Sequence, residues 1–207
     1  MNLSLNEVRA MARKAARGAG YDWALADEAG WACGALCEAG IDGVAALAGL
    51  LEAGGADCVG GLEVSDAVWR RGSGQICPVY AGTVLCDRRA LSARVLALDG
   101  VVSPIMLLPY IRAALRGGKG PVIVTCERGR ANIDAQSIYI MKDFSEVPVR
   151  VDITATEDIP PHRHASSRAS PDPAAWDVLT TYAHRTYAPA TEASRLRGAG
   201  GDLPDTD

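Results

Sequence analysis

Residues 121–141 read PVIVTCERGRANIDAQSIYIM, and this stretch decides the fold class. Its first part, 121–127, carries a continuous β-branched run and is predicted to be a strand. Arg128-Gly129 is a plausible two-residue turn, after which residues 131–141 are expected to return as the partner strand. Farther along, residues 147–156 alternate apolar and polar side chains, as a half-buried strand does. These patterns predict an antiparallel sheet in the middle of the chain.

Upstream of this stretch the chain changes from helical to strand-like patterns. Residues 79–86 and 94–98 are further runs that we expect to be strands. Before them, the first helix is predicted to begin after Ser4, because Ser4 and Glu7 have the spacing of a capping box. Two more helices are expected, at residues 22–39 and 44–53, each closed by glycine.

The order of elements is therefore helices, then strands, then a helix near residues 173–184. Such segregated runs favour an α+β fold over a doubly wound α/β sheet. We expect an N-terminal helical bundle, a central mostly antiparallel sheet, and a C-terminal helix and tail. The length of 207 residues suits a single domain. Its predicted subregions are a helical part at 1–56, a strand-rich part at 75–156, a loop at 157–172, and a helix with a tail at 173–207.

Composition and charge exclude several classes of function. The net charge of −4 is unlike the basic face of a nucleic-acid binder. The apolar stretch 101–111 is too short to cross a bilayer, and no leader pattern opens the chain, so we expect a cytoplasmic protein that binds neither nucleic acid nor membrane. The six cysteines form no CxxC pair and are expected to be reduced, buried and small hydrophobes.

Motifs for cofactors and metals are weak. The glycine-rich segments lack the strand–loop–helix setting of a phosphate-binding loop, so no cofactor is predicted. His162 and His164 have a spacing that some metal sites use. Arg163 lies between them and Pro160-Pro161 precede them, so a solvated loop is the expected structure and no metal site is predicted.

The most function-like segment of the sequence lies at 184–197, where His, Arg, Tyr, Glu and Ser are concentrated. We interpret it as a recognition patch for a small anionic metabolite, in which Arg185 and Arg195 donate bidentate hydrogen bonds beside the Tyr187 hydroxyl. The alternative is a docked C-terminal helix held by a Glu192–Arg195 ion pair. The candidate ligand-binding residues are His184, Arg185, Tyr187, Glu192, Ser194 and Arg195.

A different class of function is suggested by the second helix. Ala26, Gly30 and Gly34 form a stripe of small residues, and glycine inside a helix costs about 1 kcal/mol unless close packing compensates. This stripe could dock on a partner or on a second copy of the chain, which would make the protein a non-enzymatic accessory factor. Neither hypothesis assigns catalytic residues, so enzymatic activity stays open.

Two segments carry a family resemblance. The N-terminal run SLNEVRAMARKAARGAGYDWALADEAG and the C-terminal run HRTYAPATEASRLRGAG resemble an uncharacterised proteobacterial family, a domain of unknown function. The resemblance implies a stand-alone bacterial protein and transfers no catalytic residue. A fainter similarity connects the N-terminal helices to malate/L-lactate dehydrogenases outside the Rossmann group. That family carries a Gly-Ile/Val-x-Ser-His-Gly motif, whereas residues 40–44 read GIDGV, so a degenerate relative would lack the serine and the histidine.

Overall fold

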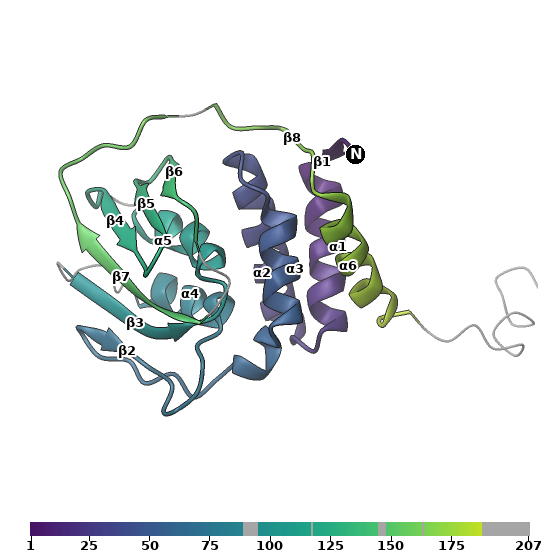
Figure 1. Ribbon diagram of the computed structural model, residues 1–207, viewed down its shortest axis with the longest axis horizontal. Coiled ribbons are helices and arrows are strands. Elements are labelled where there is room, and N and C mark those ends of the chain that lie inside the picture. The colour runs from purple at the N-terminus through teal and green to yellow at the C-terminus, as the bar shows by residue number, and fades with distance from the viewer. Residues whose placement is uncertain (89–94, 117, 145–147, 163, 188–207) are drawn as a thin grey trace, which may run out of the picture.

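A computed structural model of the chain describes residues 1–88, 95–116, 118–144, 148–162 and 164–187. It confirms the α+β class. In Figure 1 the helices α1, α2, α3 and α6 stand side by side in one part of the molecule, and the sheet forms the other part, with α4 and α5 beside it. The sheet has six strands. Both α4 and α5 contact α2, and α5 also packs on strands β5 and β6. The two short helices therefore connect the sheet to the helical layer.

The helical layer consists of α1 (Leu5–Gly18), α2 (Trp23–Glu38), α3 (Gly43–Glu52) and α6 (Pro173–His184). The capping box that begins α1 is confirmed. Its two hydrogen bonds run from Ser4 N–H to Glu7 Oε2 (2.7 Å) and from Glu7 N–H to Ser4 Oγ (3.2 Å). A hydrogen bond from Ala175 N–H to the Asp172 carboxylate (3.0 Å) begins α6. Side-chain caps thus define where these helices start.

The small-residue stripe of α2 packs against α1 of the same chain. A Cβ added at Gly30 would lie 2.9 Å from the backbone oxygen of Arg9, and one at Gly34 would lie 2.5 Å from the Arg9 side chain. The close helix approach that compensates glycine in a helix is therefore intramolecular. In this structure α1 covers the glycines of the stripe, so they are not exposed for contact with another protein.

The sheet has the strand order β2-β3-β7-β4-β5-β6, and among the strands that the structure describes only the β2–β3 pair is parallel. The central hairpin is confirmed, but its turn is Glu127-Arg128, because Cys126 N–H donates to the Gly129 oxygen (3.0 Å) and closes the loop. The strands are β2 (Val68–Trp69), β3 (Val95–Val101), β4 (Val122–Thr125), β5 (Arg130–Ile133), β6 (Ile138–Lys142) and β7 (Val149–Ala155).

The partner strand expected at 131–141 is divided in two. The Asp134 carboxylate accepts hydrogen bonds from the backbone N–H groups of Gln136 (2.8 Å) and Ser137 (2.6 Å). Such an Asx turn reverses the chain. The prediction of one long strand is therefore wrong, and β5 and β6 form a second antiparallel hairpin.

The strand expected at 79–86 is also wrong, because this segment is the helix α4 (Pro78–Asp87). Pro78 occupies the first turn, where its missing N–H costs nothing. A short apolar run does not distinguish strand from buried helix, and here packing against α5 (Leu108–Ala114) decides. A Cβ at Gly82 would lie 2.3 Å from the Tyr110 ring, so glycine permits the close approach. The described residues also form the 3-10 helices η1 (Gly55–Cys58) and η2 (Pro104–Leu107).

Two short strands join the beginning of the chain to the segment before α6. Strand β1 (Leu3–Ser4) pairs antiparallel with β8 (Arg168–Ala169). Arg168 reinforces the pairing by donating to the side-chain and backbone oxygens of Asn2, both at 2.8 Å. Figure 1 shows the chain crossing from β7 over the edge of the molecule to β8 and α6. The last helix thereby returns to pack on α1 and α3.

Candidate functional site

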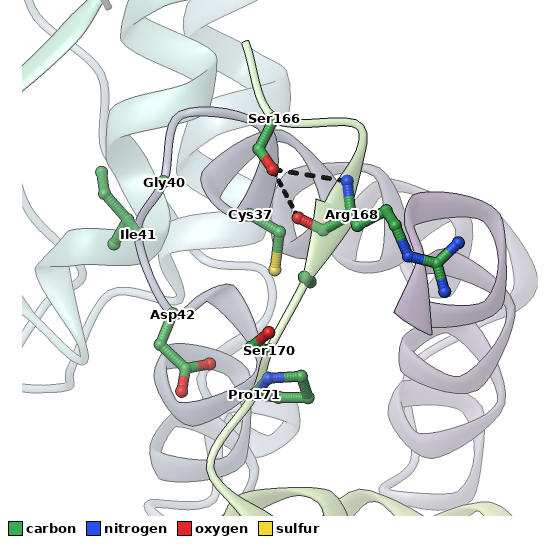
Figure 2. Close-up of a pocket in the computed structure, with 9 residues that line it drawn as sticks. Cys37, Gly40, Ile41, Asp42, Ser166, Arg168, Ser170 and Pro171 are labelled. Carbon is green, nitrogen blue, oxygen red and sulfur yellow. Dashed lines mark hydrogen bonds between the residues drawn. The ribbon is translucent and has the colours of Figure 1, made fainter. Parts of the chain in front are cut away.

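A pocket of about 260 Å³ lies where the turn between α2 and α3 faces the segment around β8 (Figure 2). We call it the α2–α3 pocket. One wall comes from the end of α2 and the following turn, and the other from the segment that leads to α6. Its lining residues are Cys37, Gly40, Ile41, Asp42, Ser166, Arg168, Ala169, Ser170 and Pro171.

Asp42 holds the two walls together. One carboxylate oxygen caps α3 by accepting from Val44 N–H (3.1 Å) and Ala45 N–H (3.0 Å). The other oxygen accepts from Asp172 N–H (3.0 Å), and Asp172 is itself the N-cap of α6. One side chain therefore fixes the start of α3 relative to the start of α6.

The second wall is held by backbone contacts. Ser166 N–H donates to the Glu38 oxygen at the end of α2 (2.8 Å), and the Ser166 hydroxyl bonds to the backbone of Arg168. Figure 2 shows the Arg168 guanidinium pointing away from the pocket, which agrees with its bonds to Asn2. The backbone of Arg168 therefore lines the pocket, while its guanidinium charge lies outside it.

The reactive group of the pocket is the Cys37 thiol. The pKa of Cys37 is lowered from 9.0, chiefly by a hydrogen bond from the Cys33 thiol, with further help from the N–H groups of Gly43 and Val44. Those N–H groups lie at the N-terminus of α3, the end of a helix that stabilises a thiolate. Burial and the Asp42 carboxylate oppose the shift. The pKa of Cys33 is raised well above 9.0, mainly because its proton is engaged by Cys37.

A cation accompanies this pair of thiols. Arg9 of α1 lies against Gly34, one turn before Cys37 on α2, and its charge favours ionisation of Cys33. The Arg9 Nε is buried and has no hydrogen-bond partner among the described residues. The Arg9 guanidinium forms no ion pair with a carboxylate of the described residues, so its positive charge is left to act on Cys33.

Other cysteines provide the contrast. Burial raises the pKa values of Cys58, Cys77 and Cys86, and that of Cys86 rises to about 11. Cys37 is only 4% exposed, yet its thiolate is favoured. No cysteine of the described residues is in a disulfide, in agreement with the expectation of reduced cysteines. The expectation that all six cysteines are buried is wrong for Cys86 and Cys126, which are half-buried.

The sequence did contain a signal for this site. Cys33 and Cys37 are four residues apart on a predicted helix that ends at Gly40, and a new helix was expected a few residues later. A helix that ends next to the start of another can bring a thiol to the N–H groups of the second helix. The missing information was the direction in which the chain turns at 39–42.

The described part of the predicted C-terminal site lies on the surface at the end of α6. The rings of His184 and Tyr187 are 5.4 Å apart, and the Arg185 guanidinium lies 4.3 Å from the Tyr182 ring centre. The Lys14 ammonium lies 5.8 Å from the ring centre of Tyr187. None of the described three, His184, Arg185 and Tyr187, lines the α2–α3 pocket. Glu192, Ser194 and Arg195 lie outside the described residues.

The histidine pair is placed along the crossing segment. His162 Nδ1 lies 2.9 Å from the Ser137 hydroxyl, and its Nε2 lies 3.9 Å from the Asp134 carboxylate. Within the part of the chain that the structure describes, no three His, Cys, Asp or Glu side chains gather as metal ligands. No helix in that part is long and apolar enough to span a bilayer.

The fold and the site thus define an α+β protein in which a cysteine of lowered pKa lines a small pocket. Residues 3–87 match the model of a family described as a protein of unknown function (DUF3726). The match runs from β1 to α4 and includes Cys33, Cys37 and Asp42, whereas the second wall of the pocket and the C-terminal segment lie beyond it. No curated protein matches the chain.

Proposed function

We propose that the protein binds a small polar molecule in the α2–α3 pocket and that the Cys37 thiolate is the group that engages it. The observation that supports this most directly is the lowered pKa of a cysteine that lines a cavity. A perturbed titratable group in a cavity marks a candidate functional site. The thiolate rather than the thiol is the nucleophile, so a lowered pKa increases the fraction of the reactive form at a given pH.

The chemistry of the pocket favours a neutral electrophile. Asp42 and the Cys37 thiolate already place negative charge at one wall, while the Arg168 guanidinium points elsewhere. A small carbonyl compound fits these conditions. The sulfur would form a bond to the carbonyl carbon while the carbon–oxygen π pair moves to the oxygen, and that oxygen would take a proton from water to give a hemithioacetal. Atoms and electrons balance without an external oxidant.

Alkylation of the folded protein by iodoacetamide, with sites mapped by peptide mass spectrometry, tests the proposal. Near neutral pH we expect Cys37 to react faster than Cys86, although Cys86 is the more exposed of the two. The Cys37 rate should increase with pH along a titration curve whose midpoint lies below 9.0. Equal labelling of Cys37 and Cys86 would overturn the proposal.

A variant pair isolates the role of the neighbouring thiol. Cys33→Ala removes the hydrogen-bond donor and should slow alkylation of Cys37 near neutral pH, whereas Cys33→Ser keeps a donor and should preserve the rate. Cys126→Ala, on the other side of the molecule in the β4–β5 hairpin, is the control. If Cys33→Ala left the pH profile of Cys37 unchanged, the assigned cause of the lowered pKa would be wrong.

The charge of the reagent tests the class of ligand. Iodoacetate is the anionic counterpart of iodoacetamide and should discriminate strongly against Cys37, because Asp42 lies beside the thiolate. The ratio of the iodoacetate rate to the iodoacetamide rate is measured at Cys37 and, as the reference, at Cys126. A ratio at Cys37 that is as high as the ratio at Cys126 would favour an anionic ligand instead.

The anion-recognition role of the C-terminal segment is a second proposal. It is supported by two cations near the end of α6, because Arg185 lies over the half-buried Tyr182 ring and Lys14 of α1 lies near the exposed Tyr187 ring. A thermal-shift series with phosphate and carboxylates should then show stabilisation that Arg185→Ala abolishes. An unchanged response in Arg185→Ala would leave docking of α6 as the explanation of these contacts.

A further inference from the structure

A second cavity, of about 270 Å³, lies between α2, α4 and α5 and shares no residue with the α2–α3 pocket. Each of the three helices contributes side chains. Glu28 and Trp31 come from α2, Thr83, Cys86 and Asp87 from α4, and Tyr110 and Ala113 from α5. Its character differs from that of the first pocket, because aromatic rings and carboxylates dominate its lining.

The aromatic wall is held in place before any ligand binds. The rings of Trp31 and Tyr110 are 5.1 Å apart and inclined by 60°. The Tyr110 hydroxyl donates to the backbone oxygen of Glu28 (3.0 Å), and the ring of Tyr110 lies directly against Gly82. With its hydroxyl bound and its ring wedged, Tyr110 has little freedom to rotate, so the cavity has a fixed shape.

The charge in this cavity is negative and unbalanced. Glu28 and Asp87 both line it, and no lysine or arginine of the described residues does so. The Glu28 carboxylate has no hydrogen bond or ion pair to any described residue, whereas its neighbour Asp27 lies 3.2 Å from Arg13. Burial, with smaller contributions from Asp87 and Asp27, raises the pKa of Glu28. The carboxylate is thus partly desolvated without a compensating cation.

We propose that this cavity binds a small organic ammonium ion. An ammonium group is attracted to the faces of Trp and Tyr rings, and the attraction grows when the cation is shielded from water. Two carboxylates next to such rings add direct charge complementarity. The ligand would be the cationic partner that the Glu28 carboxylate lacks among the described residues.

Other ligand classes fit less well. A calcium or magnesium ion requires six or more oxygen ligands at short distance, and this lining offers two carboxylates, one of them exposed, beside an indole and a phenol ring. An anion would meet two negative charges. A purely apolar molecule would leave the Glu28 carboxylate desolvated and unpaired, which is unfavourable. The ammonium ion satisfies both the rings and the carboxylates.

Calorimetric titration of the full chain with tetramethylammonium chloride, against sodium chloride at equal ionic strength, tests the proposal. Saturable binding is expected only with the organic cation. Glu28→Gln, which is isosteric, and Trp31→Leu, which removes the ring face, should each weaken binding about tenfold. Asp27→Asn removes a carboxylate one residue away that already has an arginine partner, and it should leave the affinity within about twofold.

Two outcomes would overturn the proposal. One is the absence of binding beyond the sodium chloride control. The other is binding that persists unchanged in Glu28→Gln, which preserves volume and therefore folding. The result is independent of the Cys37 chemistry, because saturating tetramethylammonium should leave the iodoacetamide rate at Cys37 unaltered.

Discussion

Replacement of Asp42 by alanine should cost the protein more stability than its exposed position suggests. The carboxylate caps α3 through Val44 and Ala45 and also accepts the N–H of Asp172. Loss of a cap costs about 1 kcal/mol, and loss of a hydrogen bond to a charged group costs about 1.5 kcal/mol. Since Asp42 is exposed to solvent, we expect Asp42→Ala to lower the free energy of unfolding by about 2 kcal/mol.

Two variants separate the contributions. Asp42→Asn keeps an oxygen for the α3 cap, because asparagine caps as well as aspartate, but its amide nitrogen cannot accept from Asp172 N–H, so about half the loss is expected. Asp177→Ala removes an exposed carboxylate of α6 whose side chain caps nothing, and it should change stability by less than about 0.5 kcal/mol.

Urea unfolding followed by circular dichroism measures these differences. With a slope of about 2 kcal/mol per molar urea, the midpoint should fall by about 1 M in Asp42→Ala and by about 0.5 M in Asp42→Asn. If Asp42→Ala shifts the midpoint no further than Asp177→Ala does, Asp42 does not hold the two helix starts together. Equal losses in Asp42→Ala and Asp42→Asn would show that the cap contributes nothing.

Three further outcomes follow from the packing between α2, α4 and α5. Gly82→Ala should destabilise the protein by about 2 kcal/mol in thermal or urea unfolding, because its Cβ would overlap the Tyr110 ring, whereas Gly120→Ala, with open space around it, should be neutral. Tyr110→Phe loses the hydrogen bond to the Glu28 backbone and should cost about 1 kcal/mol by the same measurement. The raised pKa of Glu28 means that the folded protein favours the protonated carboxyl. The stability that this protonated form contributes is present below pH 4.5 and is lost as the pH rises through the raised pKa. Glu28→Gln should therefore gain stability relative to the wild type between acid and neutral pH, and a constant difference across that range would contradict the assigned shift.

Local signals predicted most of the elements. The helix starts at Ser4 and near residue 173 and the hairpin near residue 128 depend on caps and turns that lie within a few residues, and local hydrogen bonds hold them in the structure. The segment 79–86 was misassigned because its short apolar run has no clear period. Its helical structure is supported by packing against α5, more than twenty residues away, and against α2.

The α2–α3 pocket could not be predicted from the sequence, because it also depends on contacts between distant parts of the chain. Cys37 and Asp42 are near each other along the chain, but Ser166 and Ser170 reach the same cavity through a crossing segment. No periodicity or spacing encodes contacts between parts of a chain that far apart. The cysteine pair was visible as a spacing, and only the structure shows that α3 begins beside it.

The pairing of β1 with β8 has a consequence for how the protein is made. The helical layer is complete only when α6 packs on α1 and α3, so its first and last parts are separated by the whole sheet region. During synthesis the faces of α1 and α3 that contact α6 stay uncovered until residues 168–184 have been made. Contacts of such high sequence separation slow folding, and a ribosome-bound chain exposes the α1 surface until late. The second wall of the pocket is added in that same final step, so only chains that have finished folding carry an assembled site around Cys37.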